Sequence, residues 1–554
     1  MTYGVKTKRR ILVGGIVSSA MALACHSPAM AQANNASSPP KRVAAAPRIA
    51  FNDILAIGSP RGAEQGAEAD SQIGAVIVEG NEAIGQERYQ QAIEPFFGEP
   101  LTDEVIERLT DELTQIAKDE GYAYARAEVD RDAAKLGILK IAIDEGRVDE
   151  VRIEGSDNAL ARKMLNKLVG RPINKAELER TLLLVSDIPA VRLRQAKLKR
   201  EGDGAQKRGV LMITLQERDP SFRVAADNYG SENFGPIRAN VLGRGSGILL
   251  SGDEISTSVR INPIEPDELL FVSGSYSTAL NDSGATLRLS GSVGRTSPGD
   301  IPGGADITGD KIGATASVSV PIKRSRKASA WIEADASYIS ISQDDLGTLL
   351  RDDTIVTASV GLRTRFALAG GVARTGVSLQ RGLDILGATR LGDPAASRFD
   401  GDGVFTKFRF NADFRVPLAK RLSLYVAAAG QLADRPLLGP EEISLGGAYR
   451  TRGYDFAEVL GDEGVYGIAE IRYNVPTGKL PLRYLQLYGF VDGGYVSDID
   501  LTGGEGSLFS AGPGLRTRLG PLDLELEGGF PLGGSGERTE DADPQVNVRA
   551  GINF

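Results

Sequence analysis

The chain ends in the stretch QVNVRAGINF, residues 545–554, in which apolar and polar side chains alternate one by one. Such alternation is the period of a β-strand, whose successive side chains point to opposite faces. One face carries Val546, Val548, Ala550, Ile552 and Phe554, and the other carries Gln545, Asn547, Arg549 and Asn553. A soluble protein that exposed five apolar groups on its last strand would risk aggregation. The stretch is therefore predicted to turn its apolar face to lipid, as the closing strand of a barrel.

The same alternation runs upstream over the whole chain beyond Arg218. Between residues 408 and 416, three Phe, an Ala and a Val occupy one face, and two Arg, an Asn and an Asp occupy the other. An antiparallel sheet of a soluble protein would also alternate. However, no stretch approaches the roughly 20 continuous apolar residues that a membrane-spanning helix needs. A closed barrel is the remaining way to cross a bilayer.

The lengths of the connections between these strands distinguish a membrane barrel from a soluble antiparallel sheet. Short connections lie at residues 280–284, 322–327, 368–371, 417–420 and 520–521, and they take turns with long ones at 295–310, 340–353, 382–402, 432–464 and 532–541. Short turns at one rim and long polar loops at the other are typical of single-chain outer-membrane barrels. Residues 219–554 are therefore predicted to form a transmembrane antiparallel β-barrel of about 16 strands.

Two copies of one unit precede the barrel. Glu-Gly-Asn at residues 79–81 returns as Glu-Gly-Ser at 154–156, and the stretch 137–143 returns 72 residues later at 209–215. Such spacing indicates tandem domains. We assign them to residues 73–146 and 147–218, each with the order strand, helix, helix, strand, strand.

The helices of these units follow from their apolar faces. Acidic residues 103 and 104 open a helix after Thr102, and Gly121 ends it. Its apolar face carries Val105, Leu109, Leu113 and Ile116. In the second unit, helices are expected near residues 160–168 and 175–186.

The start of the chain has the form of an export signal. Residues 1–31 carry a basic start, an apolar run from Ile11 to Ala24, and an Ala-Met-Ala site at 29–31. The alternative is a lipoprotein lipidated at Cys25, but Ala22 stands where such signals prefer Leu. Residues 32–72 are rich in Ala, Ser, Pro and Gly and read as a linker. The apolar patch at 49–57 is its one possible short helix.

Removal of residues 1–31 narrows the possible chemistry. The chain loses its single Cys and single His, so a Ser-His-Asp triad, a Cys nucleophile and a typical zinc site are excluded. No phosphate-binding Gly-Lys motif is present, and no pair of carboxylates stands out for glycoside hydrolysis. We therefore expect that the protein is not an enzyme and that it binds neither a cofactor nor a metal. The 64 basic residues fall to 60 against 73 acidic ones, and a net charge of −13 argues against nucleic acid as partner.

Four stretches carry a resemblance to a known family. They are GILKIAIDEG at 137–146, DNYGS at 227–231 with Gly235 and Gly252-Asp253 downstream, YRTRGY at 449–454, and GFVDGG at 489–494. Together they resemble the outer-membrane transporters of two-partner secretion, of the haemolysin secretion/activation type. This family belongs to the larger superfamily of POTRA-domain translocases and insertases. The resemblance covers nearly the whole mature chain and implies that the two repeats are POTRA domains in the periplasm.

The resemblance also implies a pair of charges inside the barrel. Strand alternation turns Asp492 toward the lumen, together with Gln486 and Tyr488. The family places its R-G-Y loop motif, here Arg452, Gly453 and Tyr454, in an inward-folded sixth loop. Arg452 is thus expected to bind Asp492, with Arg450 as the alternative cation. At the other end of the barrel sequence, Val548, Ile552 and Phe554 are expected to serve as the C-terminal assembly signal.

The function that the resemblance implies is secretion of a large exoprotein, an adhesin or haemolysin, from periplasm to cell surface. The POTRA domains would bind this partner unfolded, while lipid surrounds the barrel and the barrel-assembly machinery inserts it. The alternative is an assembly factor that inserts other outer-membrane proteins, although such factors generally carry more than two POTRA domains. A passive porin or receptor would not explain the two repeats.

Overall fold

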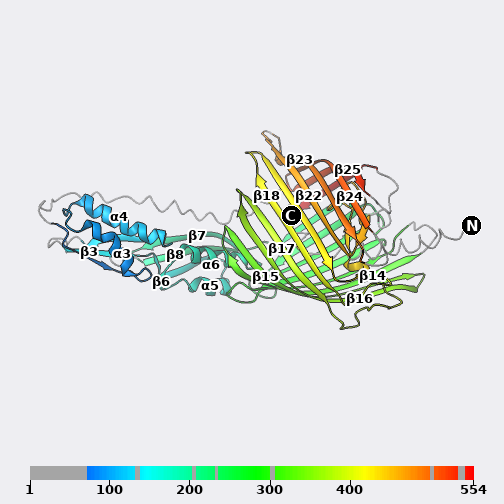
Figure 1. Ribbon diagram of the computed structural model, residues 1–554, viewed down its shortest axis with the longest axis horizontal. Coiled ribbons are helices and arrows are strands. Elements are labelled where there is room, and N and C mark those ends of the chain that lie inside the picture. The colour runs from blue at the N-terminus through cyan, green and yellow to red at the C-terminus, as the bar shows by residue number, and fades with distance from the viewer. Residues whose placement is uncertain are drawn as a thin grey trace, which may run out of the picture. The chain divides into compact units, whose positions relative to one another are not determined.

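The computed structural model describes residues 72–130, 138–202, 208–230, 235–299, 306–478, 480–499, 505–534 and 543–554. The expected leader at 1–31 and the possible helix at 49–57 lie outside these residues. The chain divides at Arg218 into two compact units, the repeats and the barrel, which are described separately below (Figure 1). Within the described ranges, no helix is both long and apolar enough to span a membrane.

The second unit is a closed barrel of sixteen antiparallel strands, as expected (Figure 1). The strands are β9 (Ser221–Asp227), β10 (Arg238–Ser246), β11 (Glu254–Ile261), β12 (Leu269–Ala279), β13 (Thr286–Thr296), β14 (Ile307–Arg324), β15 (Ala328–Asp345), β16 (Thr348–Leu368), β17 (Gly371–Gly382), β18 (Thr406–Pro417), β19 (Leu422–Ala433), β22 (Glu463–Val475), β23 (Leu482–Ser497), β24 (Glu505–Leu519), β25 (Leu522–Gly534) and β26 (Gln545–Asn553). Each strand pairs with the next, and β26 pairs with β9 to close the ring.

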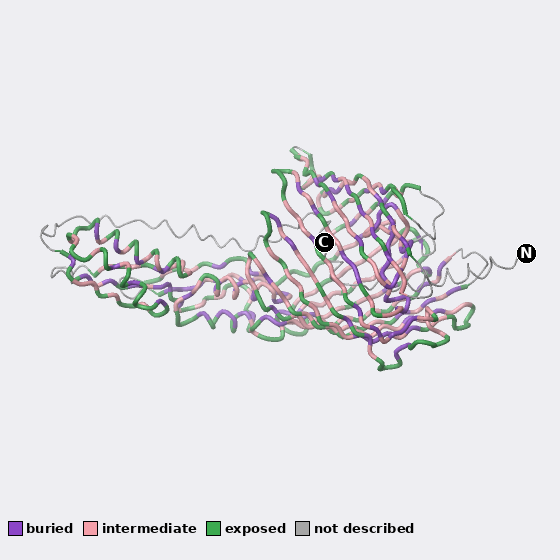
Figure 2. Tube along the Cα trace, viewed as in Figure 1, coloured by how far each residue is buried: buried purple, intermediate pink, exposed green. Residues whose placement is uncertain are grey.

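Exposure alternates along these strands and separates the two faces (Figure 2). On β18, Phe408 is 40% exposed on the outer face, whereas its neighbour Lys407 is 1% exposed. On β26, Val546 and Val548 are exposed, whereas Asn547 is buried. The apolar-out, polar-in pattern read from the sequence is therefore the pattern of the barrel wall.

One expected long loop is a hairpin instead. β15 and β16 continue to Asp345 and Thr348, so only Leu346 and Gly347 turn the chain where a loop at 340–353 was expected. Both residues have positive φ, 50° and 79°, which suits the tight turn of a twisted two-stranded ribbon. The ribbon extends past the first pair between β16 and β17, Thr357 with Gly382.

Loop 5, residues 383–405 between β17 and β18, covers the edge that this extension leaves. The backbone N–H of Leu383, Thr389 and Asp352 donate to the carbonyls of Val356, Thr354 and Ala395, respectively, at 2.7 to 2.8 Å. Loop 5 thus takes the place of a neighbouring strand beyond the end of β17.

The first repeat packs two helices on a three-stranded sheet. Its elements are β1 (Ala75–Glu79), α3 (Gln86–Ile93), the 3-10 turn η1 (Glu94–Phe96), α4 (Asp103–Asp119), β2 (Arg126–Asp130) and β3 (Ile138–Asp144). The sheet order is β1-β3-β2, with β1 and β3 parallel. Thr102 caps α4 by accepting the backbone N–H of Val105, and Leu109 and Leu113 are fully buried. Ala117, rather than the expected Ile116, completes the buried face.

Glu145 explains the acidic end of the motif at 137–146. Its side chain is 2% exposed and accepts the backbone N–H of Glu82, Ala83 and Ile84 at 3.0, 2.6 and 2.9 Å. These three N–H groups lie in the turn after β1, and the single carboxylate of Glu145 accepts a hydrogen bond from each of them. Gly146 follows with φ +86°, and a Cβ there would lie 2.8 Å from Tyr124 Cβ.

The second repeat has the same order, with one additional pair of short strands, β4 and β6. Its elements are β4 (Arg147–Val148), β5 (Glu150–Gly155), α5 (Ala159–Asn166), β6 (Arg171–Pro172), α6 (Lys175–Asp187), β7 (Val191–Glu201) and β8 (Arg208–Glu217). The sheet order is β5-β8-β7, with β5 and β8 parallel. The two expected helices are α5 and α6. Gly80 just after β1 and Gly155 at the end of β5, the glycines of the repeated Glu-Gly motif, both have positive φ.

Candidate functional site: an arginine cage in the barrel lumen

Loop 6, residues 434–462 between β19 and β22, folds into the barrel. It contains the turn η5 (Gly439–Glu441) and a small hairpin of β20 (Ile443–Leu445) and β21 (Val459–Gly461). Leu445 and Val459 pack with Val496 and Leu508, whose side chains point inward from β23 and β24. Because these contacts are apolar and buried, the hairpin is fixed to the inner wall.

At the tip of loop 6, Arg452 lies among three carboxylates. Its Nε donates to Asp492 Oδ2 at 2.7 Å, and its Nη1 donates to Glu470 Oε1 at 2.7 Å and to Glu527 Oε2 at 2.9 Å. The guanidinium carbon stacks 3.5 Å from the centre of the Phe490 ring. We call Arg452, Glu470, Asp492 and Glu527 the arginine cage. It joins the loop to three strands, β22, β23 and β25.

The cage is almost sealed from solvent. Side-chain exposure is 4% for Arg452 and 0% for Asp492. Burial makes each ion costly unless it is paired and fully hydrogen-bonded. Glu470 meets this condition by also binding Arg472 at 2.6 Å and Arg516 at 3.1 Å. The loop cation is therefore one member of a larger set of opposed charges on the lumen wall.

Gly453 and Tyr454 complete the motif by close contact and by hydrogen bonds. The backbone N–H of Gly453 donates to Ser510 Oγ at 3.1 Å. A Cβ at Gly453 would lie 2.8 Å from Ser510 Cβ, so no side chain fits there. Tyr454 Oη donates to the carbonyl of Gly533 at 2.9 Å. Ser510 in turn donates to Asp492 Oδ1.

Arg450 lies elsewhere in the loop. Its Nη1 donates to the carbonyl and hydroxyl of Ser444, and its guanidinium lies 5.2 Å from the Tyr466 ring centre. It makes no contact with Asp492 among the interactions of the described residues. Of the two candidate cations, Arg450 and Arg452, Arg452 is the one beside Asp492.

The sequence did not single out Glu470, Glu527, Phe490 and Ser510, which complete the surroundings of Arg452. Alternation does place Glu470 and Glu527 on the lumen faces of their strands. Several other charged residues share those faces, however, so alternation alone does not choose the partners.

Of the three residues expected at the assembly signal, Val548 and Ile552 lie on the outer face of β26, and Phe554 follows the strand directly. Val548 and Ile552 are 44% and 36% exposed. Phe554 is 73% exposed, and its ring centre lies 6.1 Å from that of Phe222 on β9. The two aromatic rings thus meet across the junction that closes the barrel.

A second charged cluster joins three loops. Arg398 of loop 5 binds Asp400 at 3.2 Å, Glu442 at 2.6 Å, Asp462 at 2.8 Å and Asp498 at 3.6 Å. We call these five residues the rim cluster. Burial raises the pKa of Glu442 to about 8, although Arg398 opposes the shift. Burial likewise raises the pKa of Asp462.

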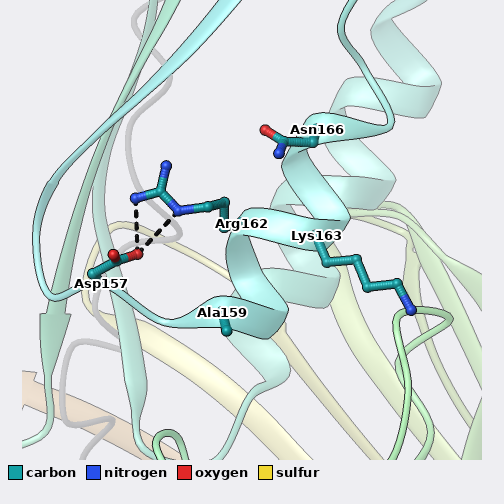
Figure 3. Close-up of a pocket in the computed structure, with 5 residues that line it drawn as sticks. All are labelled: Asp157, Ala159, Arg162, Lys163 and Asn166. Atoms are coloured by element: carbon teal, nitrogen blue, oxygen red, sulfur yellow. Dashed lines mark hydrogen bonds and ion pairs between the residues drawn. The ribbon is translucent and has the colours of Figure 1, made fainter.

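An open hollow on the second repeat holds only solvent-exposed groups (Figure 3). It lies beside α5, where Arg162 donates through Nε and Nη2 to Asp157 Oδ1 at 3.1 and 2.8 Å. Lys163 and Asn166 line the same hollow (Figure 3). Arg162 and Asp157 are paired with each other and exposed to solvent, so this hollow lacks the buried charges of the arginine cage.

Comparison with known proteins agrees with this architecture. The sequence model of a family described as "Haemolysin secretion/activation protein ShlB/FhaC/HecB" matches residues 209–517, and that of the "POTRA domain, ShlB-type" matches residues 72–146. The outer membrane transporter CdiB of Escherichia coli O6:K15:H31 is 23% identical over 486 residues, which cover 83% of this chain and 79% of CdiB. Hemolysin transporter protein HpmB of Proteus mirabilis is 27% identical over 400 residues, 66% of this chain and 67% of HpmB.

Solved structures share the fold. CdiB from Escherichia coli superposes with a TM-score of 0.74 at 21% identity and covers 95% of this chain and 98% of its own. BamA from Haemophilus ducreyi, lacking POTRA domains 1–3, reaches a TM-score of 0.52 at 12% identity, with 88% of this chain and 100% of that one covered. At these identities the likeness concerns the fold alone.

Proposed function

The chain belongs to the haemolysin secretion/activation family of outer-membrane transporters, and on that premise we propose that it moves a large, unfolded partner protein through its barrel to the cell surface. It is a transporter of partner exoproteins and not an enzyme. The observation that supports a working pore is loop 6, which occupies the lumen and is held there by the buried ions of the arginine cage. Polar contacts of this kind hold the loop in one position and are reversible.

The repeats are suited to capture an extended chain. Among the residues that the structure describes, their sheets end at β1 and β2 in the first repeat and at β5 and β7 in the second. An extended peptide can add to such an edge as a further strand through backbone hydrogen bonds, largely regardless of its sequence. We assign capture of the unfolded partner to these edges. Directionality then comes from the partner, which folds outside and cannot slip back.

Deletion of residues 73–146 tests this assignment. We expect a very large secreted protein to be encoded beside this chain, and co-expression should bring it to the cell surface. The deletion should stop its secretion, while the barrel, which keeps all sixteen strands, still inserts and still shows heat-modifiable migration on gels. Normal secretion by the deletion variant would refute capture by the first repeat. Loss of unrelated outer-membrane barrels instead of the partner would indicate an insertase.

A further inference from the structure

The turn between β10 and β11 displays three aliphatic side chains in a row. Ile248, Leu249 and Leu250 are 57%, 68% and 58% exposed. Two other turns at the same end of the barrel carry polar tips instead, Ser325-Arg326-Lys327 between β14 and β15 and Lys420-Arg421 between β18 and β19. Three exposed aliphatic side chains in a turn of seven residues, 247–253, are costly in water.

The turn is held in shape by one carboxylate. Asp253 is 0% exposed and accepts the backbone N–H of Ile248, Leu249 and Leu250 at 2.9, 3.0 and 2.8 Å. Burial raises the pKa of Asp253, but the hydrogen bonds from these three N–H groups outweigh burial, so the pKa lies below its ordinary value. The aspartate therefore stays ionised at neutral pH and fixes the display of the three side chains.

The turn folds onto the outer surface of the barrel. It lies at the end where the chain arrives from the repeats, because Arg244 just before it pairs with Ser221 at the start of β9. Gly245 faces outward, and a Cβ there would lie 2.8 Å from Ile248 Cδ1. Ile248 thus covers the outer face of β10 and continues the lipid-facing surface. Phe222 and Phe554 lie at the same end of the neighbouring strands.

The strands beside this turn are short. β9, β10 and β11 have 7, 9 and 8 residues, whereas β16 has 21. A tilted strand needs about 9–11 residues to cross the hydrocarbon layer. Strands of this length leave the apolar belt incomplete unless the adjoining turn contributes to it.

We propose that Ile248, Leu249 and Leu250 form a lipid anchor that inserts among the acyl chains of phospholipids in the periplasmic leaflet. The anchor completes the apolar belt where the strands are shortest, next to the junction of β26 and β9. It sets the depth of these strands in the membrane and acts independently of any secreted partner.

Fluorescence quenching by lipid tests the anchor directly. The chain has a single Trp, Trp331, so Trp331→Phe gives a background without indole. Leu249→Trp in that background is reconstituted in phosphatidylcholine vesicles with or without bromine on the acyl chains. We expect brominated lipid to remove about half or more of the emission, as for a group buried 5–10 Å into the interface. The matched control, Lys420→Trp, sits in a charged turn at the same end and should lose much less.

The opposite result is equally clear. If Leu249→Trp is quenched no more than Lys420→Trp by brominated lipid, and is quenched by iodide in the water phase, the anchor does not exist and the turn faces water or protein. Leu250→Trp repeats the test should Leu249→Trp not fold. A nitroxide on Leu249→Cys gives an independent depth measurement, since the only natural cysteine is Cys25 in the predicted leader.

Discussion

At the scale of single residues, Arg452 is the group on which most contacts of the loop tip depend. Its one guanidinium binds carboxylates from three strands. A branched cation suits this task because its nitrogens point to several acceptors at once. The Lys ammonium carries its charge at a single nitrogen, so Arg452→Lys should preserve the charge and lose part of the geometry.

Arg452→Ala should destabilise the loop more than Asp492→Asn does. The first change leaves three buried carboxylates without their shared cation, at a cost of about 3–5 kcal/mol for a broken buried pair. The second leaves Glu470 and Glu527 in place around Arg452. We would measure partner secretion and the temperature at which the heat-modifiable band converts. Arg450→Ala is the control and should change both less; an equal or larger effect would contradict the role given to Arg452.

The charge swap Arg452→Asp with Asp492→Arg should recover little. A pair isolated from other charges would regain part of the lost stability. Here the new aspartate would face Glu470 and Glu527, which normally bind Arg452 at 2.7 and 2.9 Å. Recovery close to wild-type secretion would show that Asp492 alone determines the position of the loop.

At the scale of elements, Glu145 ties the turn after β1 to the end of β3. Glu145→Ala leaves three backbone N–H groups without their acceptor, and we expect a loss of about 2–4 kcal/mol in the stability of the first repeat. Limited proteolysis of the full chain should then cut within residues 73–146 at lower protease concentration. Glu112→Gln, at an exposed site on α4, is the matched control. Equal resistance of both variants would mean that the turn is held by other contacts.

The rim cluster should weaken as pH rises. The pKa of folded Glu442 is raised to about 8 from an ordinary 4.5, so its contribution to loop stability is complete below about 4.5 and is lost as pH rises through 8. Loop 5 should therefore be cut faster by external protease at pH 9 than at pH 6. Glu442→Gln cannot ionise and should flatten this dependence. A wild-type cleavage rate that falls with rising pH would contradict the assignment.

At the scale of the whole molecule, the sequence predicts what repeats and fails on what is unique. Alternation predicted the strands and placed Asp492 on a lumen face, because every strand obeys the same period, and the succession of short and long connections predicted the closed barrel. The pattern of connections also predicted a long loop at 340–353, where the structure has a two-stranded ribbon instead. The prediction was wrong because polar residues are compatible with a projecting ribbon as well as with a loop. The contacts of Glu470 and Glu527 with Arg452 were not predicted, because they depend on how loop 6 folds back into the barrel, and no local sequence pattern encodes that.

Val548→Asp with Ile552→Asp should block assembly of the barrel. Both side chains face outward, and a charge on the lipid face costs roughly 2–4 kcal/mol near the bilayer midplane and less toward the rim. The variant should lack the heat-modifiable band and accumulate in the periplasm. Gln545→Asp, on the lumen face of the same strand, should assemble normally. Surface exposure of the double variant at wild-type levels would show that β26 does not face lipid.

The ribbon of β15 and β16 that extends past β17 has a further consequence for the passenger, the secreted partner protein on its way out of the pore. A chain that leaves the pore unfolded would readily pair with any bare strand edge at the exit, and such pairing would be a kinetic trap. Loop 5 already holds the carbonyls of Thr354 and Val356 along that edge. The exit therefore offers few backbone partners at this point, and the passenger is left to pair with itself.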